Sequence, residues 1–276
     1  MWELERDPAE DDPTCAPNGG SLAGAFDQPG QLAVVGTGRL GTALAAALNA
    51  EPPDGCQLVG LFGRGYDGAG VDAVLLCVPD TEIANAARLI APGPLVGHCS
   101  GATSLEVLAP HEAFSLHPLL PVTAGHPSFG GAGAAIAGST RRALAFAASL
   151  ARALRMSAIE VDDPDRAAYH AAASIASNFL VVLEDAAERI ATTAGVSREL
   201  LAPLVRATVE NWAKLGPELA LTGPVARGDE ATVSAQRAAL ESRTPELLPL
   251  FDELLAATRG LATRARAARD KEPALA

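Results

Sequence analysis

Lysine is almost absent from this chain, and several other features are missing with it. Lys214 and Lys271 are its two lysines, so a mechanism that needs a catalytic lysine has few candidates. Acidic residues outnumber basic ones by 33 to 21, and the net charge of -12 argues against a nucleic-acid or acidic-membrane partner. No apolar run reaches the ~20 residues of a membrane span. The N-terminus lacks the basic and apolar segments of a signal peptide, so we expect a cytoplasmic protein.

Cysteine is also scarce and is not arranged in motifs. Cys15, Cys56, Cys77 and Cys99 show no CxxC spacing, and two of them lie in apolar, strand-like runs. We interpret all four as reduced thiols of a cytoplasmic protein. The spacing of the histidines and cysteines matches no pattern of metal ligands, so no metal site is predicted.

The order of predicted elements indicates two domains after a tail. Residues 1–29 are acidic and rich in Pro and Gly, which is typical of a disordered segment. Strands and helices alternate over residues 30–162, which predicts an α/β domain with a doubly wound parallel sheet. Residues 163–270 carry only helical patterns and predict an all-helical domain for substrate binding and dimerisation. The strands that we expect span 31–36, 57–63, 71–79, 94–101, 113–119, 133–138 and 157–162.

Helix boundaries are predicted from capping residues. Thr81 is expected to cap a helix over 81–90. Asp163 followed by Pro164 is expected to begin a long helix that ends near Gly195. Further helices are predicted over about 198–215, 230–242 and 245–268.

A glycine-rich turn follows the first strand. In AVVGTGRLGTAL, the glycines are spaced as GxGxxG between a β-branched strand and a helix, the setting that makes this pattern a dinucleotide-binding signature. Gly36 would allow the tight turn, Gly38 would let the backbone approach the pyrophosphate, and Gly41 would let helix and strand pack closely. The alternative is a strand–helix turn without a ligand. The residues predicted to bind the cofactor here are Gly36, Thr37, Gly38, Arg39, Leu40 and Gly41.

The end of the second strand favours NADP over NAD. An acidic residue there would bind the ribose 2′-hydroxyl of NAD, but the sequence LFGRGYDG has Arg64 instead. A guanidinium suits a 2′-phosphate because it can donate two parallel hydrogen bonds. A solvated arginine is the alternative, and Asp67 is an acid further into the loop. We therefore expect NADPH as the cofactor, with NAD less favoured.

Six motifs in order resemble a known group of proteins. GTGRLGTAL, CVPD, HCSGA, SLHPL, YHAAASIASNFLVVL and LTGPVARGD are similar to those of bacterial Rossmann-like proteins with a helical C-terminal domain of unknown function. These proteins are related to ketopantoate reductase, pyrroline-5-carboxylate reductase and 6-phosphogluconate-dehydrogenase-like enzymes. The resemblance implies a Rossmann fold and NADP-dependent reduction. Relatives usually place a helix and a strand between positions equivalent to Gly63 and Val71, so this chain should have a narrower sheet.

Polar residues follow three successive strands and should meet at one edge of the sheet. Ligands of such folds bind at the carboxyl ends of the strands. His98 lies inside its strand, where a core role is the favoured interpretation. The residues that we expect in the cleft are Val78, Pro79, Ser100 and Gly101 for the cofactor, and His117 for the substrate. A structural turn is the alternative role of His117.

The long helix offers a polar stripe. His170, Ser174 and Asn178 are four residues apart and would share one helix face. This stripe could close the cofactor cleft, or it could be a polar helix–helix or dimer contact. Reduction of a carbonyl or imine needs a proton donor, and His170 leads because an imidazole can give up a proton near neutral pH. Ser174 and Asn178 would orient the substrate, and Lys214 is the alternative donor.

The segment LTGPVARGDEATV interrupts the helical domain. Asp229 can cap the helix that begins at Glu230, and Gly228 can serve the turn, but neither role explains Arg227. Because the segment is a signature of the resembling family, we expect it to line the cleft, with Arg227 and Asp229 binding substrate. Arg227 would pair with a substrate carboxylate. A surface turn is the alternative.

Three functions remain open at this point. The first is an NADPH-dependent reductase of a small oxo-acid or imino-acid such as ketopantoate, forming a homodimer through the helical domain. The second is a non-enzymatic NADP-binding regulator or scaffold. The third is a metabolite-binding module that has lost the cofactor.

Overall fold

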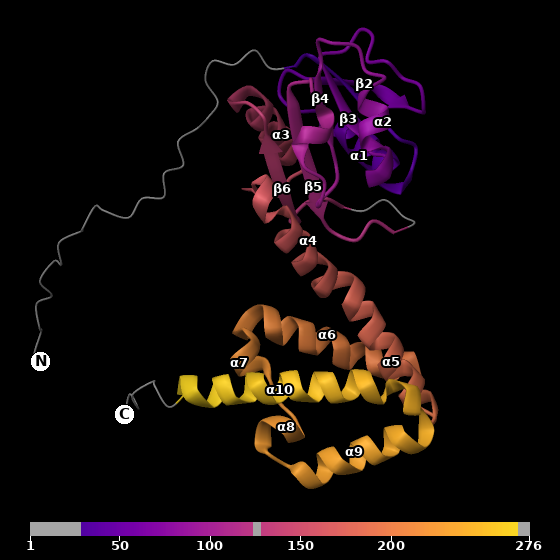
Figure 1. Ribbon diagram of the computed structural model, residues 1–276, viewed down its shortest axis with the longest axis vertical. Coiled ribbons are helices and arrows are strands. Elements are labelled where there is room, and N and C mark those ends of the chain that lie inside the picture. The colour runs from indigo at the N-terminus through magenta and orange to yellow at the C-terminus, as the bar shows by residue number, and fades with distance from the viewer. Residues whose placement is uncertain (1–28, 124–127, 270–276) are drawn as a thin grey trace, which may run out of the picture. The chain divides into compact units, whose positions relative to one another are not determined.

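The computed structural model describes residues 29–123 and 128–269 in two compact units. The first unit ends at Ala173 and the second begins at Ser174 (Figure 1). The predicted tail, apart from Pro29, lies outside the described residues, as does Cys15.

A seven-stranded sheet organises the first unit. Its strand order is β2-β1-β3-β4-β5-β6-β7. Neighbouring strands run parallel except β5 and β6, which pair antiparallel. The strands are β1 (Gln31–Val35), β2 (Gln57–Phe62), β3 (Ala73–Leu76), β4 (Leu95–His98), β5 (Ala113–Leu119), β6 (Gly133–Gly138) and β7 (Ser157–Glu160).

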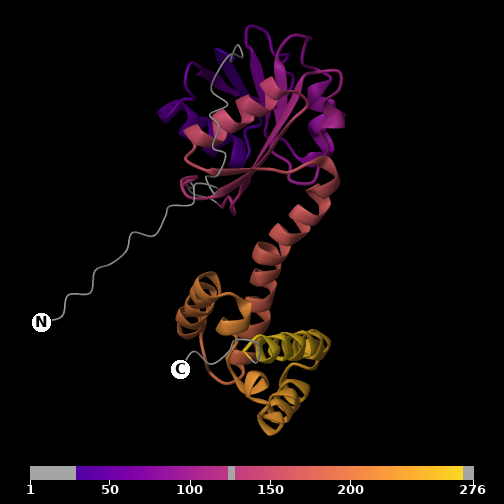
Figure 2. The same ribbon diagram turned by 90° about the vertical axis from the view of Figure 1, so that its left-hand side faces the viewer.

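Both faces of the central strands β1, β3 and β4 are buried because these strands are apolar on both sides. In β1, Leu32 packs with α1 and α3 on one face, while Ala33 packs with α2 on the other. The helices are α1 (Arg39–Ala50), α2 (Ile83–Ala87) and α3 (Arg141–Ala153). Figure 2 shows α3 lying across the strands. A T-shaped contact of Phe114 in β5 with Phe146 in α3, at 5.3 Å between ring centroids, fills the centre of that layer.

The sheet confirms the predicted α/β fold but departs from it in the direction of two strands. β6 and β7 were expected in a parallel sheet, but both run opposite to β1–β5, so this orientation was wrong. The segment between β5 and β6 contains no helix among its described residues, and an antiparallel neighbour needs no helical crossover. The short Gly63–Val71 segment, described throughout, contains no strand, and β2 forms one edge of the sheet.

Two predicted caps differ from the structure. Thr81 lies inside a 3₁₀ turn, η1 (Asp80–Glu82), which precedes α2. Asp163 is the first residue of another 3₁₀ turn, η3 (Asp163–Asp165), whose N-cap is Asp162. The carboxylate of Asp163 accepts hydrogen bonds from Ser104 and Arg166 instead of capping a helix. For Asp163, a long-range partner, Ser104, and a local one, Arg166, therefore replace the predicted capping role.

Helices continue from the first unit into the second. α4 (Arg166–Ser174) is followed by a π-helical turn, η4 (Ile175–Phe179), and by α5 (Leu180–Thr192). The remaining elements are α6 (Arg198–Leu215), α7 (Pro217–Ala220), α8 (Pro224–Arg227), α9 (Glu230–Arg243), η5 (Pro245–Leu247) and α10 (Leu248–Arg269). The short η2 (Leu105–Leu108) completes the first unit. Within the described part of the chain, no helix combines the length and apolarity needed to cross a membrane.

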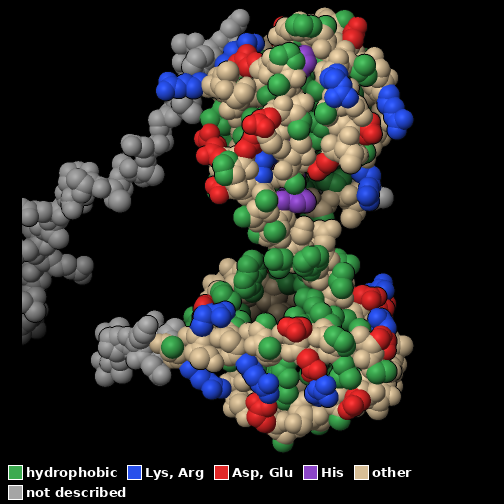
Figure 3. Space-filling view, in the orientation of Figure 1, with side chains coloured by type: hydrophobic (Ala, Val, Ile, Leu, Met, Phe, Trp, Pro, Cys, Tyr) green, Lys and Arg blue, Asp and Glu red, His purple; other side chains and the backbone are tan. Residues whose placement is uncertain are grey.

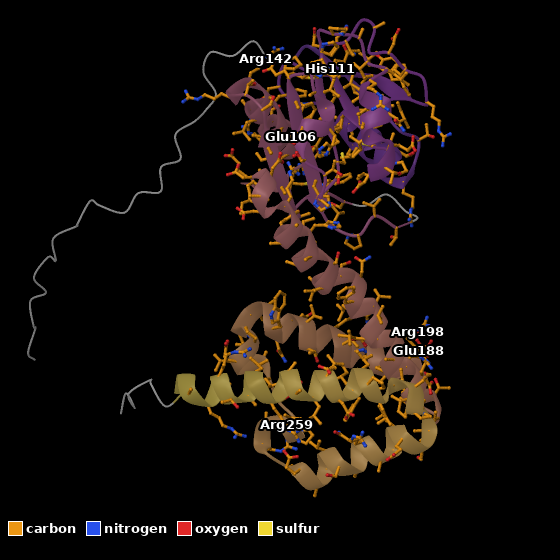
Figure 4. The ribbon with its side chains drawn as sticks, viewed as in Figure 1. Glu106, His111, Arg142, Glu188, Arg198 and Arg259 are labelled. Carbon is orange, nitrogen blue, oxygen red and sulfur yellow. The ribbon has the colours of Figure 1, made fainter. Side chains whose placement is uncertain are left out.

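The helical unit leaves much of its apolar surface exposed. Neither α5 nor α6, both described throughout, contains a buried residue. On α6, Leu200, Leu204 and Trp212 are 69%, 64% and 57% exposed. Arg198 at the start of α6 binds Glu188 of α5 through two hydrogen bonds of 2.8 and 3.0 Å (Figure 4). Hydrophobic side chains gather around a hollow on this unit (Figure 3).

Candidate functional site

Two glycines of the turn after β1 are fixed by packing. Gly36 has a φ of 119°, and a Cβ atom there would lie 2.2 Å from the carbonyl oxygen of Cys77. A Cβ atom on Gly41 would lie 1.9 Å from the carbonyl oxygen of Gly36. Both distances are far below van der Waals contact, so no other residue fits either position. The fold alone accounts for these two glycines, whether or not a nucleotide binds.

Gly38 differs because the fold does not require it. Its φ of -72° suits any residue, and a Cβ atom there would meet no heavy atom within 4 Å. It is the N-cap of α1 and provides no side-chain cap. The first N–H groups of a helix have no partner within it, and the helix dipole makes this end partially positive. The open space at Gly38 therefore exposes an anion-binding helix terminus.

This helix terminus opens into two adjoining clefts at the carboxyl ends of the strands. One cleft, of about 360 Å³, extends from Gly38 toward Arg64. The other, of about 380 Å³, extends from Gly38 toward Ser100. Both are lined by Cys77, Val78 and Pro79, which follow β3. The chain crosses from β2 on one side of β1 to β3 on the other, which is the switch point where such sheets bind ligands.

An arginine and a stacked aromatic pair lie at the edge-strand end of the first cleft. Arg64 is exposed in the turn after β2. Tyr66 stacks on Phe62 with ring centroids 4.0 Å apart, and it lines the same cleft. The short loop thus folds an aromatic ring against the cleft. Sequence reasoning missed Tyr66, although an aromatic residue in a glycine-rich loop was a usable signal.

At the opposite end, Ser100 organises the turn after β4. Its Oγ donates to Asp80 Oδ2 at 2.8 Å and accepts from the backbone N–H of Thr103 at 2.9 Å. Only 6% of Ser100 is exposed. The hydroxyl is thus committed to holding the turn, while the turn itself lines the cleft. The role of Ser100 in cofactor binding stays a prediction, and these contacts favour the backbone rather than the hydroxyl for it.

Two histidines meet beside Gly101. A Cβ atom on Gly101 would lie 2.9 Å from the rings of both His117 and His170, whose centroids are 6.0 Å apart. His117 Nδ1 lies 2.8 Å from the hydroxyl of Tyr169, and the two rings make a T-shaped contact. The structure therefore brings together Gly101, His117 and His170, which the sequence placed in three separate motifs. Sequence reasoning missed Tyr169, although it directly precedes His170.

Arg166 anchors α4 to the sheet beneath these histidines. It is 2% exposed, and it donates to Asp163 Oδ1 at 2.7 Å and to Ser115 Oγ at 2.6 Å. A buried guanidinium is stable only when it is paired in this way. Arg166 thus positions Tyr169 and His170, one turn further along α4. No sequence motif pointed to it.

Burial keeps two histidines of this region neutral at pH 7. Desolvation first, and then the Arg166 charge, lowers the pKa of His98 from 6.5 to about 4. Desolvation first, and then His170, lowers the pKa of His117 from 6.5 to about 4. His98 is fully buried in β4, where its Nδ1 accepts from the N–H of Ser100 at 3.2 Å, which fits the core role favoured from the sequence.

These pKa values predict that acid destabilises the protein. Because folding lowers both values, the neutral form stabilises the fold fully above about pH 6.5, and this stabilisation is lost as pH falls toward 4. A change of one unit in pKa corresponds to about 1.4 kcal/mol, so we expect protonation of each histidine to lower the free energy of unfolding by on the order of 3 kcal/mol. Urea unfolding at a series of pH values measures this. His98→Asn, which keeps an acceptor for Ser100, should flatten the pH dependence; an unchanged slope would contradict the role of His98.

The other predicted site residues belong to the helical unit. Asp229 caps α9 by accepting from the N–H of Thr232 at 3.1 Å, and the Thr232 hydroxyl bond is the main cause of its lowered pKa. Arg227 ends α8 and is exposed. Lys214 is exposed on α6, 4.0 Å from Glu210. The catalytic and substrate-binding roles predicted for these residues stay predictions, while the capping role of Asp229 is present in the structure.

The polar stripe on the long helix runs into a π turn. Asn178 lies in this π-helical turn, which follows Ser174. A π turn closes its hydrogen bonds five residues apart rather than four and is wider than an α-helical turn. The substrate-orienting roles of Ser174 and Asn178 stay predictions. Across residues 29–123 and 128–269, no group of three or more His, Cys, Asp or Glu side chains is placed to hold a metal ion.

Comparison with known proteins places these features in a family context. The model of a domain of unknown function, DUF2520, matches residues 133–258. No curated protein matches the chain. Protein TM1727 from Thermotoga maritima is 27% identical in sequence, with a TM-score of 0.68 over 85% of this chain and 99% of its own.

Two further solved structures share the fold at lower identity. BF3122 from Bacteroides fragilis, provisionally named an NADP oxidoreductase, is 20% identical, with a TM-score of 0.70 over 83% of this chain and 98% of its own. Pyrroline carboxylate reductase from Plasmodium falciparum, solved with NADP bound, is 13% identical. Its TM-score is 0.56 over 84% of this chain and 98% of its own. The region 133–258 is thus similar to DUF2520 and follows Rossmann-like strands, which confirms the resemblance to Rossmann-like proteins with a helical C-terminal domain of unknown function.

Proposed function

We propose that this protein is an NADPH-dependent reductase of a small oxo-acid or imino-acid. The observation that carries the proposal is the open space at Gly38, a position where the fold itself accepts any residue. A side chain there would stand over the N-terminus of α1, where a pyrophosphate would accept hydrogen bonds from the backbone. The pyrroline carboxylate reductase solved with NADP and the reductive aminase from Aspergillus terreus solved with NADPH4 support the same cofactor.

The two clefts suit the two halves of the nucleotide. On the edge-strand side, Arg64 would pair with a 2′-phosphate and the exposed face of Tyr66 would stack on adenine. On the other side, the backbone at Ser100 and Gly101 would contact the nicotinamide. The bound cofactor would supply the hydride. The protein would orient the ring, exclude water and deliver a proton.

The histidines beside Gly101 are suited to the proton transfer. His117 is neutral and is held by Tyr169, so it can position a neighbouring polar group without adding charge. His170 lies next to it at the amino-terminal side of the π turn, and we assign it the role of proton donor. Arg227 of the helical unit is proposed to bind the substrate carboxylate.

We also propose that the helical unit pairs with a second copy of the chain. α5 and α6 bury none of their residues, and the buried side chains of this unit, such as Val233 and Leu247, belong to its other elements. About nine large apolar side chains on η4, α5, α6 and α7 are at least half exposed. If each of these side chains exposes roughly 100 Å², their summed area is close to the ~800 Å² that each partner buries in an interface of standard size. This apolar face needs a partner at all times. A second copy of the chain meets this need because it is present wherever the protein is made.

Titration of the purified protein with NADPH and NADH tests the reductase, followed by assays with ketopantoate and pyrroline-5-carboxylate. We expect NADPH to bind more tightly than NADH and to be oxidised by a substrate of this class. Arg64→Ala should weaken NADPH binding about 10-fold or more, because a charge-assisted hydrogen bond contributes ~1.5–3 kcal/mol. NADH binding should stay nearly unchanged.

Arg152→Ala removes an exposed arginine of α3 and serves as the matched control. Equal affinities for NADPH and NADH would contradict the role of Arg64. Binding of NADPH without turnover of small oxo- and imino-acids would favour the non-enzymatic regulator. A protein that binds neither nucleotide would be the metabolite-binding module without a cofactor.

A further inference from the structure

Two cysteines from separate sequence motifs meet at the base of the clefts. Leu76 pairs with His98 in the parallel register of β3 and β4, so Cys77 and Cys99 are the next residues along the two strands. Their Sγ atoms are 3.6 Å apart. Neighbouring strands lie ~4.8 Å apart, which is within the Cα separation of 4.4–6.8 Å that a disulfide spans. A bond between these sulfurs thus requires side-chain rotation and small shifts rather than rearrangement of the sheet.

One member of the pair, Cys77, is also accessible, which separates it from the remaining described cysteine. Cys77 is half-buried and lines both clefts, and Cys99 lines the cleft on the Ser100 side. Cys56 is buried, and burial first and then Asp72 raise its pKa to about 11. A small oxidant that enters the clefts can therefore reach Cys77, while Cys56 stays a buried, protonated thiol.

We propose that Cys77 and Cys99 form an oxidation site, which a peroxide converts into a reversible intrachain disulfide. The sulfur of Cys77, as its thiolate, attacks hydrogen peroxide and becomes a sulfenic acid, while one oxygen leaves as water after protonation. The sulfur of Cys99 then attacks the sulfur of Cys77, and the second oxygen leaves as water. Overall, two thiols and one peroxide give one disulfide and two waters.

The order of the two steps follows from the surroundings of each thiol. The contact with Cys77, followed by burial, raises the pKa of Cys99 well above its ordinary value. A protonated thiol is a poor nucleophile, so the more exposed Cys77 reacts first with the oxidant. Cys99, already at 3.6 Å, is then positioned to resolve the sulfenic acid before a second oxidation.

The disulfide would act on the glycine-rich turn. The carbonyl group of Cys77 occupies the space that a Cβ atom on residue 36 would need. The Cβ atom of Cys77 lies 3.1 Å from the position of a Cβ atom placed on Gly41. Closing the sulfurs from 3.6 Å to ~2.05 Å therefore shifts a residue that is packed tightly against this turn. We expect oxidation to weaken NADPH binding at least about 10-fold and bound NADPH to slow oxidation. This consequence, unlike the disulfide itself, rests on the proposed function.

The test treats the reduced full-length chain with about one equivalent of hydrogen peroxide. We expect two of its four thiols to be lost, the mass to fall by two hydrogens, and a peptide with Cys77 to be linked to one with Cys99. Dithiothreitol should reverse all three. Cys99→Ala should instead give sulfenic and higher acids at Cys77, and Cys56→Ala should still form the disulfide.

Each outcome bears on a different part of the proposal. Acids at Cys77 without a linked peptide in the wild-type chain would overturn the disulfide, as would linkage through Cys56. Unchanged NADPH affinity after linkage would overturn the coupling to the turn. If reduced protein binds no NADPH, the proposed cofactor fails, while the linked peptide still decides the oxidation site.

Discussion

Gly38→Asp should abolish measurable NADPH binding and leave the fold intact. The backbone of Gly38 has a φ that any residue adopts, and a side chain there meets no protein atom within 4 Å of its Cβ. The new carboxylate would stand at the N-terminus of α1, where the pyrophosphate is expected. It would compete for the same N–H groups and repel the phosphates. It would also interact favourably with the helix dipole, so the helix itself should not be destabilised. We expect a loss of affinity of at least about 100-fold.

Calorimetry with NADPH and thermal unfolding of the same samples would measure both parts of this prediction. Gly130→Asp is the matched control, because Gly130 is exposed in the loop before β6 and has ordinary van der Waals space for a Cβ atom. Its NADPH affinity should equal that of the wild type. Gly36→Ala should instead unfold at lower temperature, since its Cβ would clash with the backbone of Cys77. Wild-type affinity in Gly38→Asp would show that this helix terminus is not a phosphate site.

The strands were predictable because each is an apolar run with clear ends. β5 and β6 have the predicted bounds, Ala113–Leu119 and Gly133–Gly138. The direction of β6 was not predictable, because a buried strand has the same residue pattern whether it runs parallel or antiparallel. Its pairing with β5 depends on the connecting segment, and residues 124–127 of that segment lie outside the described part of the chain.

The candidate site was predictable where it depends on local chain geometry. The glycine spacing indicated the turn and the helix terminus, because φ and close packing at Gly36 and Gly41 are local requirements. Pairs that depend on tertiary register were not predictable. His117 meets Tyr169, and Cys77 meets Cys99, only because the fold brings separate motifs together. The cysteines were interpreted from the sequence as unrelated core thiols, since no spacing connects them.

The π turn shows a different limit of sequence patterns. Its residues, Ile175–Phe179, have the pattern of an ordinary helix, with a polar residue every four positions before and within it. One wider turn rotates the faces of α5 relative to those of α4, and nothing in the composition of the segment indicates it. Arguments from helical spacing therefore hold for α4 and α5 separately. The substrate-orienting roles of Ser174 and Asn178 stay predictions.

The helical unit supports a prediction about assembly. Leu204→Glu combined with Trp212→Glu should convert a dimer into a monomer, because both residues lie on the apolar face of α6 and are more than half exposed in the single chain. In a pair of chains, each glutamate would be buried without a partner, which costs several kcal/mol per charge. We expect the dissociation constant to rise by at least about 100-fold. Light scattering after size-exclusion chromatography measures this directly.

Gln236→Glu adds one negative charge at an exposed position of α9 and should leave the dimer unchanged. The double variant should also lose thermal stability and bind a hydrophobic dye, because the uncovered unit has no core in α5 or α6 to hold it together. A wild-type chain that stays monomeric and stable at all concentrations would contradict the second copy as the partner. A dimer that persists in the double variant would place the interface on another face, and the exposed side chains of α6 would then need a different occupant.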